Sequence, residues 1–180
     1  SKSKEIALNR FEQWLQQEQK RSAEQYRPWT VPKVLSVTSQ EGTDFIVEES
    51  QVVQTTGHVA NQDDYRVELE IPSGVNRVTG WKIEVFPHED HVNGMFTRNG
   101  NGDFILPNVK ALIRQRGNPS ELELENFSAR ADYQAKKHRK TEWDTRYSNI
   151  KETLNDDARD GSTTQGAEEV TPYVGVYKLE

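Results

Sequence analysis

An acidic loop near the C-terminal end carries oxygen-bearing side chains of the kind that a hard cation prefers. Asp156, Asp157, Asp160 and Thr163 lie in one short stretch beside Gly161. Calcium takes roughly six to eight oxygen ligands from carboxylates, carbonyls and water, and a loop that curls around the ion supplies them. The composition therefore predicts a structural calcium site at these four residues. The alternative is an ordinary solvated acidic turn.

Residues 93–103 form a second candidate site, because they contain three Asn-Gly pairs. Asn and Gly tolerate positive φ angles, so this loop can fold back tightly. A sugar site combines an aromatic ring, which covers the apolar face of the sugar, with planar polar groups that orient its hydroxyls. The loop and the charged segment 134–149 supply both kinds of group, and turn formation is the alternative role of the loop. We expect ligand contacts from Phe96, Arg98, Asn99, Asn101, Trp143 and Tyr147.

The one cluster of basic residues in the sequence lies at positions 136–140. Arg offers a bidentate fork and Lys a mobile point charge, so this cluster can meet the sulfate or carboxylate groups of an anionic polysaccharide. A solvated loop is the alternative interpretation. Nucleic acid is not expected as a partner, because the formal net charge is -6 at pH 7 and no aromatic residues are interleaved with the cluster.

Catalysis finds little support in the sequence. The absence of cysteine excludes disulfides, thiolate zinc sites, cysteine nucleophiles and covalent attachment of a c-type haem. No P-loop, Gly-x-Ser-x-Gly, His-Glu-x-x-His or dinucleotide motif occurs. The 29 acidic residues are too many for proximity in the sequence to single out a catalytic pair. We therefore expect a non-enzymatic protein. The sequence also contains no apolar run as long as a transmembrane segment.

The elements that must position these groups follow two hydrophobic periods. Leu8, Phe11 and Leu15 lie on one helical stripe, which predicts an amphipathic helix over residues 4–26 that stops before Pro28. We expect this helix to pack on the domain or to be the tail of a preceding one, and a free partner-binding helix is the alternative. After the helix the period is two. Because only 33% of the residues are hydrophobic, the core must be thin, which suits two packed sheets.

Alternation of apolar and polar residues predicts antiparallel strands with one wet face. No strand–helix–strand rhythm occurs, so a parallel α/β sheet is not expected. Trp29 and Trp81 lie in strand-like alternation, and we expect both in the core. The expected strands are 29–35, 44–47, 51–55, 65–71, 81–85, 103–106, 109–113, 122–124, 129–133 and 173–179.

Four stretches, in this order, resemble a module of large planctomycete surface proteins that also carry cytochrome-c-like domains. They are Arg-Pro-Trp-Thr-Val at 27–31, Asp-Tyr-Arg-Val at 64–67, Val-Thr-Gly-Trp-Lys-Ile-Glu-Val-Phe-Pro at 78–87 and Asn-Gly-Asn-Gly-Asp-Phe-Ile-Leu at 99–106. A weaker similarity continues through 127–133, 153–161 and 174–177. The chain departs from the module at 107–108, where Ser-Glu is usual, and at Ser162, where the relatives usually have tryptophan.

The resemblance implies an all-β fold, an antiparallel jelly-roll β-sandwich similar to galactose-binding-like modules, preceded by the amphipathic helix. The chain then divides into the helix, residues 1–28, and the sandwich, residues 29–180, which ends before the last strands of the relatives. The implied function is carbohydrate binding or surface recognition by an accessory module of a larger extracytoplasmic or cell-surface protein, with calcium in the acidic loop. The alternative is a structural or protein-interaction module that positions neighbouring redox or catalytic domains without binding sugar.

Overall fold

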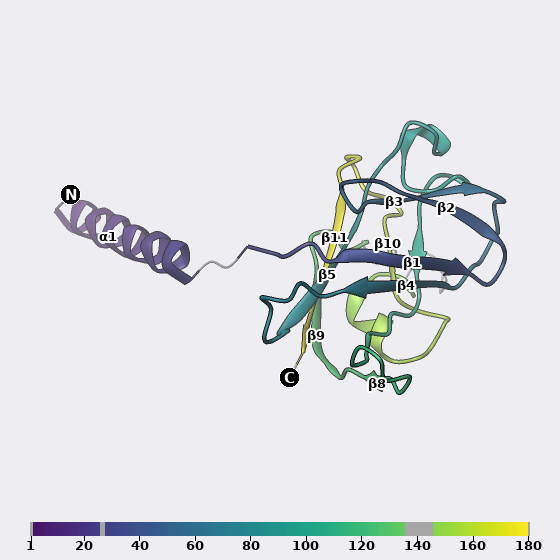
Figure 1. Cartoon of the computed structure of the whole chain (residues 1–180). Helices are drawn as coiled ribbons and strands as arrows, with labels where there is room; N and C mark the ends of the chain where they lie inside the picture. Colours follow the sequence, from purple (N-terminus) through teal and green to yellow (C-terminus); the bar gives the residue numbers. More distant parts are fainter. Residues whose placement is uncertain (1, 26–27, 136–145, 180) are drawn as a thin grey trace.

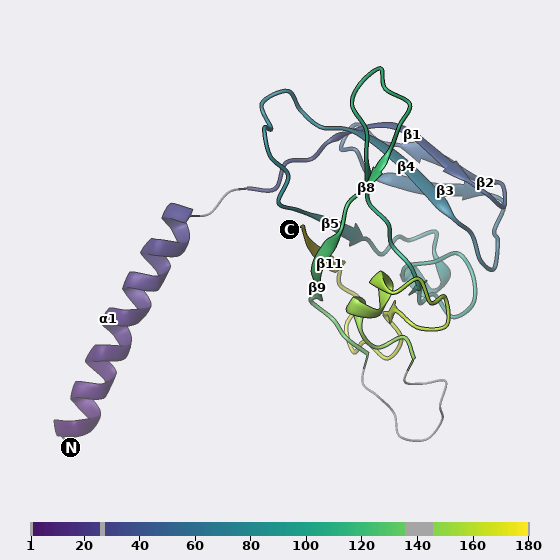
Figure 2. The ribbon, with the colours of Figure 1, turned by 90° about the horizontal axis from the view of Figure 1, so that it is seen from below.

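The computed structural model describes residues 2–25, 28–135 and 146–179, and it consists of one long helix and a β-rich body (Figure 1). Helix α1 spans Lys2–Gln25, which confirms the helix predicted from its apolar spacing. Figures 1 and 2 show α1 extending away from the body. Its apolar stripe is exposed and does not pack on the body, with 58% of Leu8 and 56% of Phe11 accessible to solvent. No helix in the described residues is long and apolar enough to cross a membrane.

The β-rich body is built from small antiparallel sheets. β5, β11 and β9 form a three-stranded sheet with β11 in the centre, and the other described strands pair as β1–β4, β2–β3, β6–β10 and β7–β8. The strands are β1 (Lys33–Ser39), β2 (Thr43–Val47), β3 (Val53–Gly57), β4 (Tyr65–Glu70), β5 (Gly80–Val85), β6 (Ile105–Leu106), β7 (Leu112–Ile113), β8 (Leu122–Glu123), β9 (Asn126–Ala131), β10 (Ser162–Thr163) and β11 (Tyr173–Leu179). Short 3-10 helices, η1 (Val92–Gly94) and η3 (Ile150–Leu154), complete the described elements.

The all-β class with an N-terminal helix is therefore confirmed, and the strands with the clearest alternation lie where the sequence predicts them. β1 begins at Lys33 rather than at Trp29. The reason is Pro32, which has no N–H group to donate to a sheet. β3 begins at Val53 rather than at Gln51, because Gln51 has a φ of 70° and its N–H closes a turn onto the Glu48 carbonyl.

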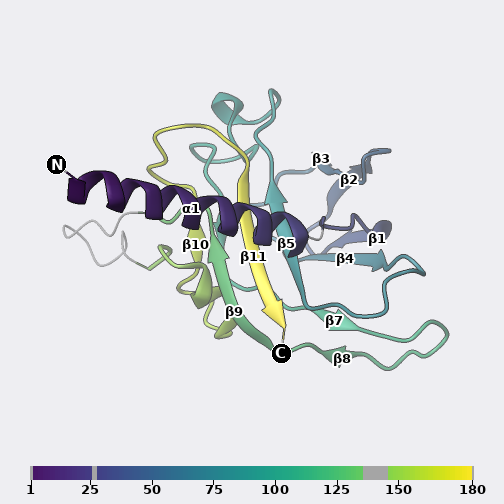
Figure 3. The same ribbon diagram turned by 90° about the vertical axis from the view of Figure 1, so that its left-hand side faces the viewer.

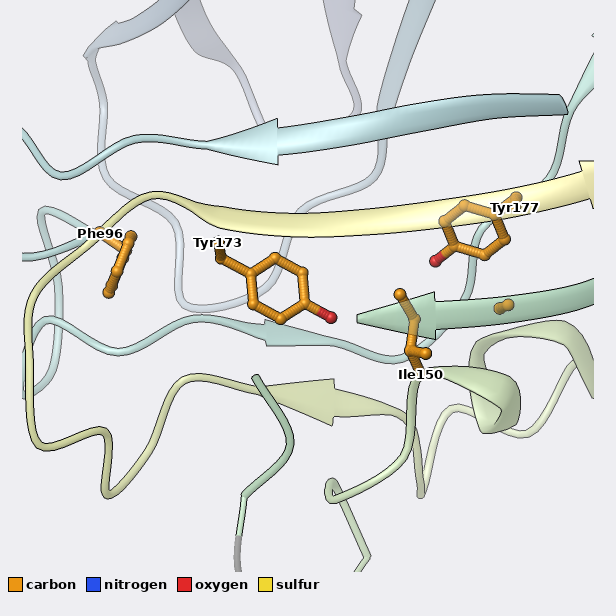
Figure 4. Close-up of a cluster of buried hydrophobic side chains, with 5 residues drawn as sticks. Phe96, Ile150, Tyr173 and Tyr177 are labelled. Carbon is orange, nitrogen blue, oxygen red and sulfur yellow. The ribbon is translucent and has the colours of Figure 1, made fainter. Parts of the chain in front are cut away.

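The core lies on one side of the β5–β11–β9 sheet. Its buried apolar side chains come from several elements, and Figure 4 shows the Ile150 side chain pointing toward β11 between Tyr173 and Tyr177. Trp81 stacks on Tyr177 with ring centroids 4.0 Å apart, which agrees with its predicted core position. The buried apolar residues are Phe96, Ala129, Ile150, Tyr173 and Tyr177.

The two buried tyrosine hydroxyls have hydrogen-bond partners. Tyr177 Oη lies 3.0 Å from Thr153 Oγ1, and Tyr173 Oη lies 2.8 Å from Ser162 Oγ. Burial disfavours the charged phenolate, and it raises the pKa of Tyr173 to about 12. Because the hydroxyls are satisfied and neutral, this pair is a structural part of the core rather than a reactive centre.

Candidate functional site

Arg98, a predicted ligand residue, ties the 93–103 loop to the end of β3. Its guanidinium donates hydrogen bonds to the carbonyls of Thr56, Gly57 and His58, at 2.8, 2.9 and 3.0 Å. These carbonyls lie at and just beyond the C-terminal end of β3, where the neighbouring strand no longer supplies N–H donors for all of them. The Arg98 side chain therefore stabilises the fold. These contacts agree with the alternative prediction for the loop, which is that its residues form a turn.

The other polar side chains of the loop also have partners within the chain. Asn99 Nδ2 donates to Asn61 Oδ1 at 2.6 Å, and Asn101 Nδ2 donates to Asp103 Oδ2 at 2.8 Å. Their side-chain oxygens are also engaged, since Asn99 Oδ1 accepts from the Gly100 N–H at 2.7 Å and Asn101 Oδ1 accepts from the Asp103 N–H at 3.2 Å. The structure thus brings Arg98 and Asn99 together with residues 56–61, a pairing that the sequence does not indicate.

Phe96, the predicted aromatic platform of this loop, is a correction. Only 6% of the residue is exposed, and its ring packs edge-on against Phe104 at a centroid distance of 5.8 Å. A platform must offer one open ring face to a sugar. Phe96 instead belongs to the core, because the loop closes on itself through the hydrogen bond from the Phe96 N–H to the Gly102 carbonyl and its ring joins the hydrophobic cluster.

The second predicted loop is described only in part. Trp143 and the basic cluster at 136–140 lie outside the described residues. Tyr147 is partly buried, and its hydroxyl donates to the Ala158 carbonyl at 3.2 Å. This contact holds the acidic loop against residues 146–149. The predicted pairing of Trp143 with Tyr147 as a sugar platform stays a prediction.

The predicted calcium ligands point to different partners. Asp156 pairs with Lys110 at 2.8 Å, and the Asp157 carboxylate receives the Arg159 guanidinium in a bidentate contact. Hydrogen bonds from Arg159 lower the pKa of Asp157 to about 2.

The other two predicted ligands are also engaged. Asp160 accepts from Asn155 Nδ2, and the buried Thr163 hydroxyl donates to the Phe104 carbonyl at 2.6 Å. In the part of the chain that the structure describes, no three His, Cys, Asp or Glu side chains are grouped as metal ligands. The calcium site stays a prediction, in which the ion replaces Lys110 and Arg159 as the countercharge.

That prediction has a direct thermal test. A cation that binds the folded state raises its stability by mass action. If calcium binds at the acidic loop, the melting temperature will be higher in calcium than in chelator. Asp156→Ala combined with Asp157→Ala will remove the difference. Equal wild-type melting temperatures in the two solutions, measured by calorimetry, contradict the site.

The outer face of the β5–β11–β9 sheet, the side turned away from the core, carries an ordered set of charged residues. Figure 3 shows β11 between β5 and β9. Val176 on the central strand is paired with Lys82 on β5 and with Arg130 on β9, so two cations flank one valine. Next along the sheet, Val174 is paired with Glu84 and receives the Asp132 carboxylate on its N–H. The rows are about 7 Å apart, and the flanking side chains of one row stand on strands about 10 Å apart.

Trp29 lies at the β5 edge of this outer face, and its position is a second correction. The sequence predicts a core tryptophan, but 46% of Trp29 is exposed, and the Lys82 ammonium lies 5.8 Å from its ring centroid. Because β1 begins only after Pro32, Trp29 lies outside the strand, and its ring is not held on the core side of a sheet. The face thus combines an open aromatic ring with an exposed Arg130, for which no partner occurs among the described residues.

Comparison with known proteins adds no assignment. No protein-family model, no curated protein and no solved structure matches this chain. The resemblance to the planctomycete module accordingly stays a prediction.

The sequence carried a partial signal for the outer face. Lys82 and Glu84 alternate with the core residues of β5, and Arg130 alternates with Ala129 and Ala131 of β9. Alternation identifies the wet side of each strand but not which strands are neighbours. Lys82 and Arg130 share a face only because β11, which is formed by residues near the C-terminal end, lies between β5 and β9.

Proposed function

We propose that this chain is a non-catalytic carbohydrate-recognition module of a larger extracytoplasmic protein, and that the outer face of the β5–β11–β9 sheet contacts the glycan. The observation that carries the proposal is the exposed Trp29 ring beside a sheet face with Lys82 and Arg130. An open indole covers the apolar face of a sugar ring, while charged groups orient hydroxyls or bind carboxylate and sulfate. The jelly-roll sandwich and the bound calcium belong to the same proposal.

The two cations of the outer face favour an anionic glycan. Lys82 is already paired with Glu84 at 2.9 Å, so Arg130 is the more available cation. A guanidinium offers parallel donors that match a carboxylate or a sulfate. Asp132 lies in the next row and engages the Val174 N–H, which leaves Arg130 without that carboxylate as a fixed partner.

Affinity electrophoresis tests this proposal with dextran sulfate and polygalacturonate as anionic probes and dextran as the neutral one. Trp29→Ala will weaken retention by at least one probe by roughly tenfold, which corresponds to about 1.4 kcal/mol of stacking. Arg130→Gln will weaken retention by the anionic probes alone. Val31→Ala is the matched control, because Val31 is an exposed neighbour of Trp29 with no ring.

A folded Trp29→Ala protein that is retained like the wild type would place recognition elsewhere. If no polysaccharide retards the wild type, the second candidate remains, a structural module that positions neighbouring domains. The exposed apolar side chains of β1 and β4 favour this candidate, since large uncovered apolar patches mark interaction surfaces.

A further inference from the structure

The apolar side of the β1–β4 sheet is only partly covered, since Phe45 of β2 packs edge-on against Tyr65 with ring centroids 5.2 Å apart. Because side chains alternate along a strand, Tyr65, Val67 and Leu69 of β4 share one side. About half of each residue is exposed, at 51%, 45% and 49%. Val37 stands opposite Val67 and Val34 stands opposite Leu69, so the apolar patch extends across both strands. We name these five residues the apolar face.

The polar side of the same sheet contacts another part of the body through ion pairs. Arg66 pairs with Glu121, and Glu68 pairs with Arg114 at 3.0 Å. Arg114 and Glu121 lie in the loop between β7 and β8, so these ion pairs hold the β7–β8 hairpin to the charged side of β4. This reverses the usual order, in which the apolar side of a half-buried sheet meets the rest of the domain. The part of the apolar side around Val67 and Leu69 is therefore open to a second molecule.

Helix α1 presents a complementary uncovered surface. Leu8, Phe11, Trp14 and Leu15 lie on one stripe, and they are 58%, 56%, 53% and 38% exposed. Most helices in proteins are held by packing of their apolar side rather than by intrinsic propensity. α1 extends away from its own β-rich body, which leaves the stripe accessible to another molecule (Figure 1).

The total surface also exceeds that of a compact monomer. The chain exposes 13887 Å². A folded monomer of this mass is expected to expose about 9,000 Å². The stripe of α1 and the apolar face both contribute exposed apolar surface to this total.

We infer that the chain forms a symmetric dimer in which α1 of each copy packs on the apolar face of the other. Two-fold symmetry makes the helix–sheet contact twice. A stable interface buries about 1,600 Å² in total, or about 800 Å² for each contact. The aromatic side chains Phe11, Trp14 and Tyr65, each more than half exposed, are the largest contributors to such a contact. This reciprocal packing of α1 on the partner copy is a property separate from glycan recognition and does not depend on it.

Two single variants of the full chain test the exchange. By sedimentation velocity, the wild type will be a dimer, whereas Phe11→Lys and Val67→Lys will each be monomeric at the same concentration. The matched controls lie on the opposite sides of the same elements. Gln16→Lys on α1 and Thr38→Lys on β1 will remain dimeric. Leu69→Lys replaces Val67→Lys if the circular dichroism of the latter shows loss of fold.

Mixing the two monomeric variants is the decisive step. The Val67→Lys copy keeps an intact helix and the Phe11→Lys copy keeps an intact face, so one of the two contacts can re-form. Dimer will therefore reappear in the mixture and in neither variant alone. A monomeric wild type overturns the inference. So does a dimer lost in only one of the two variants, because it points to pairing of helix with helix or of sheet with sheet.

Discussion

Trp81→Ala will lower the free energy of unfolding by about 3 to 5 kcal/mol, the range found when a large buried aromatic side chain is removed. The indole lies parallel to the Tyr177 ring, with centroids 4.0 Å apart and an angle of 4° between the planes. Its Nε1–H donates to Asn126 Oδ1 at 2.9 Å, which ties β5 to the start of β9. The substitution removes the stacking partner of a fully buried tyrosine and leaves this amide oxygen without its donor.

Urea unfolding followed by circular dichroism measures the effect, and Trp29→Ala is the control. Trp29 has the same side chain, but it is 46% exposed and contacts the Lys82 ammonium at 5.8 Å. Its removal will change the free energy of unfolding by less than about 1 kcal/mol. Equal losses for the two tryptophans would contradict the assignment of Trp81 to the core.

The strands could be predicted where the alternation of apolar and polar residues matches the burial of alternate side chains in the fold. β4, β5 and β11 alternate cleanly, and their bounds lie within one or two residues of the predictions. The start of β1 could have been predicted as well, since Pro32 is visible in the sequence and cannot donate to a ladder. Which strands pair could not, because alternation carries no information about partners far apart in the chain.

The candidate site was harder to predict, because the same residue types serve ligands and folds. Arg98 is a plausible ligand residue from its loop, but its guanidinium binds carbonyls at 56–58, some 40 positions earlier. Phe96 poses the same difficulty, because the sequence of a loop does not distinguish an aromatic residue that covers a sugar from one that fills the core. The prediction of Trp29 as a core residue was wrong because its strand-like alternation resembles that of Trp81, although Trp29 lies before β1 begins.

Gly175→Ala will destabilise the protein by about 1 to 3 kcal/mol, the usual cost of adding a methyl group to a filled core. Gly175 lies on β11 between the two buried tyrosines. A Cβ at this position would approach Ile150 Cδ1 to 2.6 Å, and carbon atoms of both rings to 3.6 Å. No positive φ is involved, so the cost arises from packing and not from backbone strain. Ile150 cannot retreat easily, because it is fully buried beneath the strand (Figure 4).

A double-mutant cycle separates this contact from other causes. Ile150→Val removes the Cδ1 atom that the new methyl group would meet, and alone it will cost about 0.5 to 1.5 kcal/mol. In the double variant the two groups no longer collide, so the combined loss in urea unfolding will be smaller than the sum of the single losses. Gly74→Ala is the matched control, since a Cβ there meets no atom within 4 Å. Additive losses at Gly175 and Ile150 would show that the glycine is required for another reason, such as the approach of β5 or β9 to the central strand.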